Sequence, residues 1–244
     1  FRRRFGSHIS SFCNIIGSTM ARLTGNGAYL YAGPEFAVAS TKAFTNMVAV
    51  FALFAITVSE INPTEKKELV SELRRLPNKI STQLLDDDGS IDRAVDLLSS
   101  SSSAIFIGRG LSSHLTEEGA LKMMEVAYLP CLSYPGGELK HGPIALIEDG
   151  TPVVAIAPGD STATLMESSI RECKSRGAIV IAITDMGDNA SQYCDIVITT
   201  EETHPDLSPI VNSIPLQLMA YKLAVLKGTN VDRPRNLAKS VTVV

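Results

Sequence analysis

Residues 118–143 read EGALKMMEVAYLPCLSYPGGELKHGP, and the chain is organised around this stretch. Its first half predicts an amphipathic helix, because Glu118, Lys122 and Glu125 follow one another at helical spacing and share one face. After a glycine pair, the second half carries further titratable side chains, among them His141. Charges at this spacing usually form a salt-bridged solvent face, but they are also the side chains that move or stabilise protons.

Short apolar runs alternate with helical patterns on both sides of this stretch. Residues 104–110 (AIFIGRG) form an apolar run that ends in a glycine-rich turn. Similar runs predict strands at 152–160, 178–185 and 195–200, and amphipathic segments predict helices at 161–176 and 208–227. This alternation predicts an α/β fold with a mostly parallel sheet flanked by helices. Ligands of such sheets bind outside the carboxyl ends of the strands, where the Gly-Arg-Gly turn falls.

The N-terminal part has a different character. Two short strands and a helix are predicted there, at 11–16, 28–31 and 43–58. Ser40 at the mouth of this helix suits either a bound phosphate or simple capping, because a helix N-terminus presents unpaired N–H groups. Residues 62–98 are charged and helical in pattern, with Thr64 as a candidate cap, and predict a connector between two domains.

Composition and motifs argue against several function classes. The net charge is −4 and the dense basic run FRRRF is isolated, so nucleic-acid binding is not expected. The cysteines and histidines are scattered, which predicts free thiols and no metal site. A dinucleotide fingerprint, an ATP loop and a serine-hydrolase elbow are all absent from the sequence. Residues 48–58 are too few to span a bilayer and predict a buried helix; with no targeting segment, we expect a cytoplasmic protein without a membrane partner.

Three separate segments together resemble one family. They are AVASTKAF at 37–44, EGALK and ELKHGP within 118–143, and PRNLAKSVTV at 234–243. In order and wording they are similar to the isomerase half of glutamine:fructose-6-phosphate amidotransferase, also called glucosamine-6-phosphate synthase, which contains two sugar-isomerase (SIS) domains. The resemblance implies conversion of fructose 6-phosphate plus ammonia, drawn from glutamine, to glucosamine 6-phosphate in amino-sugar (UDP-GlcNAc) synthesis. It also implies a homodimer and no metal or organic cofactor.

The resemblance further implies residue roles. Glu125 would shuttle a proton between C1 and C2 of the open sugar, and Lys122 beside it would stabilise the charge of the enediolamine. Lys239 would form a Schiff base with the ketose carbonyl. His141 would handle the ring hydroxyl proton and reach the site of the neighbouring subunit. The residues expected to bind the sugar or orient the groups around it are Val38, Ser40, Ala238 and Glu118.

Departures from the family shape the expected domains. The sequence has neither the N-terminal catalytic cysteine of a glutaminase domain nor the CGTS and SQSGET loops that hold the sugar phosphate in the family. We therefore expect an N-terminally truncated chain with little or no activity by itself. The expected parts are the end of a first SIS domain (1–60), a helical connector (61–93), a second SIS domain (94–234) and a catalytic tail (235–244).

Three alternatives share parts of this pattern. A glutamine-independent sugar-phosphate isomerase or deaminase of the same fold would share ELKHGP but need no glutaminase. A non-catalytic SIS module that binds a sugar phosphate for regulation would have no use for Lys239 together with Glu125 and His141. A truncated, non-functional gene product would also lack the phosphate loops.

Overall fold

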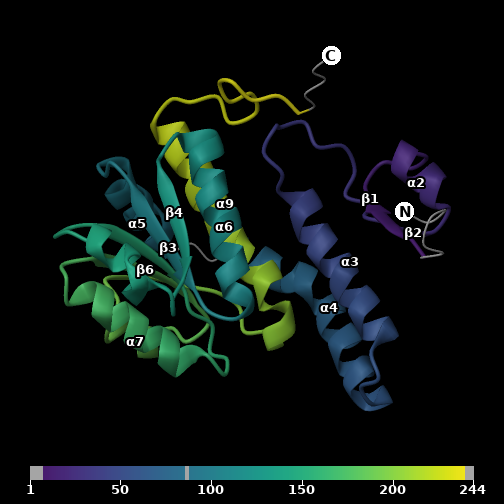
Figure 1. Ribbon diagram of the computed structural model, residues 1–244, viewed down its shortest axis with the longest axis horizontal. Helices are drawn as coiled ribbons and strands as arrows, with labels where there is room; N and C mark the ends of the chain where they lie inside the picture. Colours follow the sequence, from purple (N-terminus) through teal and green to yellow (C-terminus); the bar gives the residue numbers. More distant parts are fainter. Residues whose placement is uncertain (1–7, 86–87, 240–244) are drawn as a thin grey trace.

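The computed structural model describes residues 8–85 and 88–239. Its centre is a five-stranded parallel sheet in the order β4-β3-β5-β6-β7 (Figure 1). The strands are β3 (Ala104–Gly108), β4 (Cys131–Pro135), β5 (Pro152–Ile156), β6 (Ile179–Thr184) and β7 (Ile196–Thr199). Parallel neighbours need crossover connections, which place helices on the faces of the sheet. The expected α/β fold with a parallel sheet flanked by helices is confirmed.

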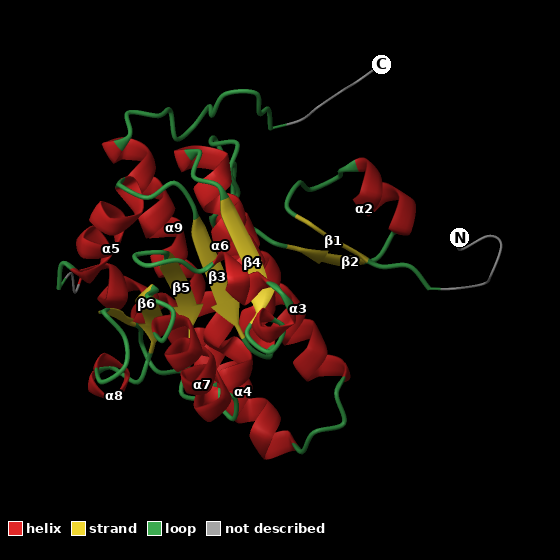
Figure 2. Cartoon of the chain, turned by 60° about the vertical axis from the view of Figure 1, so that its left-hand side comes forward, coloured by secondary structure: helices red, strands yellow, loops and turns green. Residues whose placement is uncertain are grey.

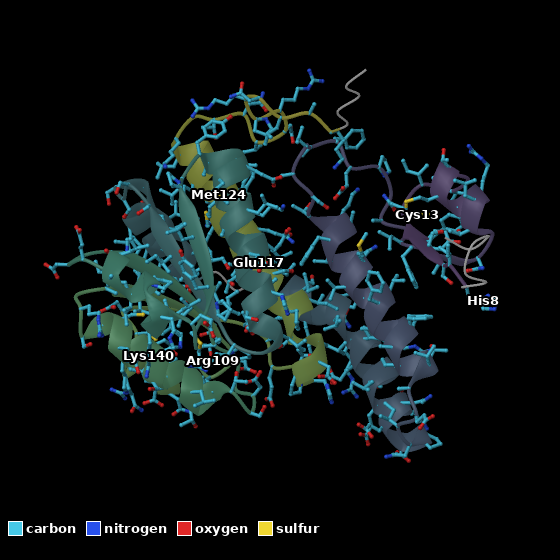
Figure 3. All side chains as sticks on the ribbon, in the orientation of Figure 1. His8, Cys13, Arg109, Glu117, Met124 and Lys140 are labelled. Atoms are coloured by element: carbon cyan, nitrogen blue, oxygen red, sulfur yellow. The ribbon has the colours of Figure 1, made fainter. Side chains whose placement is uncertain are left out.

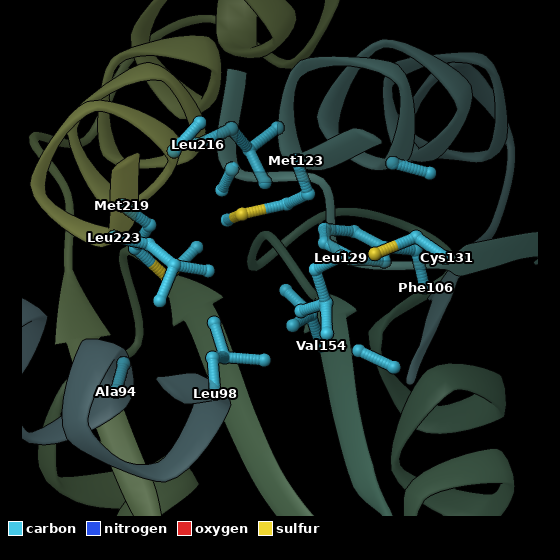
Figure 4. Close-up of a cluster of buried hydrophobic side chains, with 14 of the residues drawn as sticks. Ala94, Leu98, Phe106, Met123, Leu129, Cys131, Val154, Leu216, Met219 and Leu223 are labelled. Atoms are coloured by element: carbon cyan, nitrogen blue, oxygen red, sulfur yellow. The ribbon is translucent and has the colours of Figure 1, made fainter. Parts of the chain in front are cut away.

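Helices cover both faces of this sheet. One face packs against α5 (Ser90–Ser99), α6 (Leu111–Ala127) and α9 (Ser208–Leu226), and the other packs against α7 (Ala163–Lys174). Successive side chains of a strand point to opposite faces. Phe106 of β3 therefore belongs to the core on the α6–α9 side (Figure 4), while its neighbour Ile105 belongs to the core on the α7 side.

Short helices fill several of the connections between these elements. They are η1 (Leu139–His141), η2 (Pro143–Leu146), α8 (Asp188–Ser191) and η3 (Pro205–Leu207). Among the described residues, the segment Pro205–Leu226 alone has the length and composition of a membrane-spanning helix. Most of it is buried inside the fold, where α9 packs against α5 and α6, and this burial accounts for its apolar character.

The N-terminal elements lie outside the five-stranded sheet (Figures 1 and 2), and the two long helices among them contact α9. They are β1 (Ser11–Cys13), α2 (Thr19–Thr24), β2 (Gly27–Tyr29), α3 (Lys42–Val58) and α4 (Pro63–Leu85). β1 and β2 form a separate two-stranded parallel sheet. α4 packs on α9, because Leu76 joins a buried cluster with Ile210 and Val211. The helical connector predicted from the charge pattern therefore lies against the main domain.

The prediction that residues 48–58 form a buried helix is wrong with respect to burial. The helix forms, but Phe51, Leu53 and Phe54 are 46–47% exposed. α3 packs against α4 on one side, and its Phe51 and Phe54 contact Phe12 of β1. These neighbours are too few to cover an apolar helix on all sides, so much of its surface stays open.

Other details also differ from the sequence expectations. Edge strand β4 was not predicted, because its residues CLSYP do not alternate between apolar and polar side chains. In the structure Cys131 is the one residue of this strand that is buried. The central helix begins at Leu111 rather than at Glu118. α4 is capped by Asn62 and not by Thr64, since the Asn62 side chain accepts a hydrogen bond from the N–H of Glu65 at 2.9 Å.

Candidate active site

Two glycines bring α6 close to its neighbours. A Cβ atom on Gly108, at the end of β3, would lie 2.5 Å from the carbonyl oxygen of Ser112, so the turn into α6 needs a residue without a side chain. Farther along α6, a Cβ atom on Gly119 would lie 2.8 Å from the side chain of Leu216 in α9. The close approach of α9 at Gly119 encloses the next turn of α6, which carries Lys122.

Lys122 is a buried cation between two carboxylates. Its side chain is 5% exposed, and those of Glu118 and Glu125 are 14% and 22% exposed. Its Nζ donates a hydrogen bond to Glu125 Oε2 at 3.0 Å. It also forms an ion pair with Glu118 Oε1 at 3.1 Å, although this oxygen accepts no hydrogen bond among the described residues. A charge this deep is stable only when it is paired. The interpretation of this stripe as a solvated salt-bridged face is therefore wrong for Lys122.

The loop before α3 holds the amine of Lys239. Lys239 Nζ lies 2.9 Å from Glu35 Oε2 and 3.4 Å from the carbonyl oxygen of Val38. Ser40 donates to the same carboxylate through its Oγ, at 3.2 Å from Oε1. The structure thus brings three predicted site residues, Val38, Ser40 and Lys239, to the N-terminal end of α3. Ala238 precedes the lysine in the exposed tail.

A series of contacts fixes the path of this tail across the end of α6 (Figure 1). The hydroxyl of Thr229 donates to a carbonyl oxygen in the last turn of α6 at 2.6 Å. The phenol oxygen of Tyr128 accepts the backbone N–H of Arg235 at 2.7 Å, and the Arg235 guanidinium lies over the Tyr128 ring at 4.2 Å. The carbonyl of Asp232 accepts the N–H of Val38 at 3.0 Å. The tail therefore connects the charged helix α6 to the loop before α3.

A carboxylate of the chain itself occupies the N-terminus of α3. Glu35 Oε1 accepts the backbone N–H groups of Thr41 and Ala43, each at 3.1 Å. Partial burial alone would raise the pKa of Glu35, but hydrogen bonds from Lys239, Ala43 and Thr41 outweigh it and hold that pKa below its ordinary value. The sequence allowed either a bound phosphate or a hydroxyl cap at this helix N-terminus. Its backbone N–H groups instead donate to the carboxylate of Glu35.

His141 lies apart from the other predicted site residues. It is exposed at the end of η1, and no contact in the described part of the chain joins its side chain to Glu125 or Lys239. Its neighbour Lys140 pairs with Glu172 of α7 at 2.7 Å, which draws this loop toward α7 (Figure 3). The contacts of the described residues form two groups, Lys122 with Glu118 and Glu125 on α6, and Lys239 with the loop before α3, and His141 belongs to neither.

Metal ligation and thiol chemistry have little support in this geometry. Within residues 8–85 and 88–239, no group of three His, Cys, Asp or Glu side chains is arranged to hold a metal ion. The cysteines are free thiols, as predicted. Burial raises the pKa of Cys131 and Cys194 to about 12 and that of Cys173 to about 11, so these three stay protonated at neutral pH. The titratable side chains that the described contacts bring together are carboxylates and amines.

Sequence reasoning assigned no role to Glu35 or Tyr128. Glu35 precedes the cap position Thr41 by six residues, beyond the reach of the capping rules, so no local signal pointed to it. Its contact with Lys239 joins residues 204 positions apart, which no spacing rule reaches. Tyr128 lies at the C-terminal end of α6, and its hydroxyl and ring both hold Arg235 of the tail, a contact between distant segments that the sequence does not show.

Comparison with known proteins assigns this geometry to a family. Residues 97–227 match the SIS domain. The chain belongs to the SIS-domain family. The glutamine–fructose-6-phosphate aminotransferases (isomerizing) of Caldanaerobacter subterraneus and Chlorobaculum tepidum are 41% identical over 246 residues and 43% identical over 242 residues. These alignments cover 99% and 98% of this SIS-domain chain but 40% and 39% of the two relatives, so the chain spans less than half of their length.

A solved structure agrees with this assignment. The C-terminal domain of glucosamine-fructose-6-phosphate aminotransferase from Francisella tularensis matches with a TM-score of 0.86 at 34% identity. The match covers 93% of this SIS-domain chain and 66% of that chain. The resemblance inferred from the three sequence segments is confirmed at the level of the whole fold.

Proposed function

We propose that this chain carries the isomerase chemistry of glucosamine-6-phosphate synthesis within a longer protein. The proposed reaction converts fructose 6-phosphate and ammonia to glucosamine 6-phosphate, by way of an imine that is rearranged to the aldose. The observation that carries the proposal is Lys122, a buried cation paired with both Glu118 and Glu125 on one helix. Relatives named for this reaction align over nearly the whole chain and support the same substrate class.

Glu125 is the proposed proton carrier. Moving a proton between C1 and C2 on one face of the sugar needs a single base that can take it and return it. Glu125 has one oxygen on Lys122 and is 22% exposed, so it can meet a bound sugar. Lys122 is held by carboxylates on both sides, and its fixed positive charge would stabilise the negative charge that develops on the sugar oxygen. Glu118 keeps this cation in place.

Lys239 is the proposed nucleophile: its neutral amine would attack the carbonyl carbon of the ketose during ring opening, and loss of water would leave a Schiff base from which ammonia must later displace the lysine. Its amine lies at the loop that contains Val38 and Ser40, and Ala238 is adjacent, so these residues would line the sugar. His141 would act on the ring oxygen of the neighbouring subunit's sugar, which makes a homodimer part of the proposal. Residues 1–60, 61–93, 94–234 and 235–244 would be the first-domain remnant, connector, second SIS domain and catalytic tail of a cytoplasmic enzyme.

A chimera tests this function directly. In the Chlorobaculum tepidum relative, the aligned segment would be replaced by residues of this chain, and glucosamine 6-phosphate formed from fructose 6-phosphate and ammonia would be measured. We expect turnover, and we expect Glu125→Gln and Lys239→Ala to lower kcat by about 100-fold or more. Lys67→Ala on the exposed side of α4 is the matched control and should leave kcat unchanged.

Two outcomes would contradict the proposal. A folded chimera without turnover would show that this chain cannot supply the reaction, and full turnover in Glu125→Gln would remove the proposed base. The 244 residues alone are expected to show little or no turnover. Robust activity of the isolated chain that disappears in Lys239→Ala would overturn that last expectation while supporting the chemistry.

A further inference from the structure

We infer that Glu35 is a positioning residue for Lys239, with its carboxylate holding the lysine amine against the loop that precedes α3. The chemical meaning of this inference rests on the proposed function, in which Lys239 attacks the sugar carbonyl. The roles implied by the family resemblance fall on Val38 and Ser40 in this loop and leave Glu35 without one. Its two carboxylate oxygens serve two different parts of the chain.

One oxygen of Glu35 organises the loop itself. Oε1 accepts the N–H groups of Thr41 and Ala43 and the hydroxyl of Ser40, at 3.1, 3.1 and 3.2 Å. Backbone donors at the start of a helix have no partner within the helix, so a carboxylate that accepts them is held in a fixed orientation. This arrangement sets the direction in which the second oxygen points.

The other oxygen binds the tail. Oε2 lies 2.9 Å from Lys239 Nζ, and the Val38 carbonyl oxygen adds a second acceptor at 3.4 Å. The backbone of the same loop also binds the tail, because the N–H of Val38 donates to the carbonyl of Asp232. The lysine amine is therefore fixed from two sides by one short loop, although its own side chain is 45% exposed.

Fixing this amine matters because a lysine side chain is long and flexible. Free in solvent, it samples many rotamers, and attack on a carbonyl needs one of them. The Glu35 side chain is 11% exposed and already rigid through its bonds to α3, so it can hold Lys239 without being ordered at the same moment. Glu35 contacts the amine of Lys239, the attacking group of the proposed reaction, and would act on the sugar only through this lysine.

Replacing Glu35 with glutamine separates its two roles. An amide oxygen can still accept the N–H groups of Thr41 and Ala43, whereas the amide NH₂ cannot accept a bond from an ammonium group. Glu35→Gln should therefore keep α3 capped and release Lys239. Glu35→Ala loses both roles and should also lower the Tm by about 2–4 °C, the effect of a lost helix cap in a chain of this size.

The reactivity of Lys239 reports on this contact. The purified 244-residue chain would be reductively methylated with formaldehyde and a borane reductant, and each lysine followed by peptide mass spectrometry. The exposed Lys67 of α4 serves as the internal reference. In Glu35→Gln we expect methylation of Lys239, relative to Lys67, to become about three- to tenfold faster, as the loss of a charge-assisted hydrogen bond implies. Glu60→Gln removes an exposed carboxylate after α3 and should change nothing.

Unchanged methylation of Lys239 in Glu35→Gln, or an equal increase in Glu60→Gln, would overturn the inference. If Glu35→Gln fails to fold, Lys239→Met breaks the same pair without touching α3. That variant should be cut by trypsin after Arg235 faster than the wild-type chain, and equal cleavage would also overturn the inference. These measurements need no turnover, so a failure here leaves the proposed function standing, and an inactive chimera leaves the Glu35 contact standing.

In the active chimera, Glu35→Gln should act on the chemical step. We expect borohydride trapping of fructose 6-phosphate on Lys239 to fall about tenfold, with kcat lowered more than KM is raised. A substitution that merely loosened the loop would weaken sugar binding and raise KM instead. A rise in KM with unchanged kcat would therefore count against a positioning role.

Discussion

At the residue scale, the candidate site depends on how Lys122 is compensated. The lysine is 5% exposed and has a carboxylate one turn before it and another one turn after it. Removing one member of a buried ion pair leaves the other charges without compensation, which costs more than the pair itself contributes. The three side chains should therefore behave as one unit under mutation.

We predict that Lys122→Met lowers the free energy of unfolding by about 2–3 kcal/mol, because Glu118 and Glu125 then face each other without a cation. Adding Glu118→Gln to Lys122→Met should recover part of this loss, since one of the two carboxylates is neutralised. Urea denaturation of the two variants and the wild-type chain measures both effects. A double variant less stable than Lys122→Met alone would show that the charges are not coupled in this way.

The sequence predicted which residues form this unit but not its surroundings. The spacing of Glu118, Lys122 and Glu125 places them on one helical face whether that face meets water or protein. Burial of the lysine depends on α9 crossing α6 at Gly119, which is a contact between distant segments. Spacing alone could not distinguish a solvent face from a buried site. The family resemblance was what identified these residues as site candidates.

At the scale of elements, α9 contains a proline, and a side chain of another helix bonds the carbonyl that this proline leaves without its usual donor. Pro215 lies inside α9 and has no N–H, so the carbonyl of Val211 lacks the usual donor four residues later. Gln83 of α4 donates to this carbonyl at 3.5 Å. The polar contact joins the predicted connector to the main domain, beside the apolar contact of Leu76 with Ile210 and Val211.

We predict that Gln83→Leu lowers the free energy of unfolding by about 0.5–1 kcal/mol in the wild-type chain and by almost nothing in Pro215→Ala. An alanine at position 215 supplies the missing N–H, so the helix no longer needs the side chain of Gln83. A double-mutant cycle by thermal or urea denaturation gives the coupling between the two sites. Equal effects of Gln83→Leu in both backgrounds would contradict this account.

The elements themselves were predicted unevenly, for physical reasons. Strands buried on both faces, such as β5 and β6, have continuous apolar sequences and were found. Edge strand β4 has one buried neighbour and mixed composition, so it gave no strand signal. α3 was found as a helix, but its exposure depends on which elements pack beside it, and composition reports only that its residues are apolar.

At the scale of the whole molecule, burial is unevenly distributed. The sheet and its flanking helices contain two large buried cores, whereas among residues 8–31 only Ser11 and Leu30 are buried. The segment β1–α2–β2 is attached to α3 through Phe12, which contacts Phe51 and Phe54, and through the carbonyl of Leu30, which accepts the Asn46 side chain at 3.1 Å. A two-stranded sheet with so little buried surface has little stability of its own.

This uneven burial predicts that the chain opens in parts. Amides of β1 and β2 should exchange hydrogen through local opening, while those of β3 and β5 should exchange only when the whole domain unfolds. We expect the strand amides of residues 8–31 to exchange about 1000-fold faster than those of 104–108, measured by hydrogen exchange with mass spectrometry. Leu30→Ala should speed exchange in the first segment alone, whereas Val154→Ala in the central core should speed it in 104–108 as well. Equal protection of the two segments would mean that β1 and β2 fold in one cooperative unit with the sheet, and that the contacts of Phe12 stabilise far more than their area suggests.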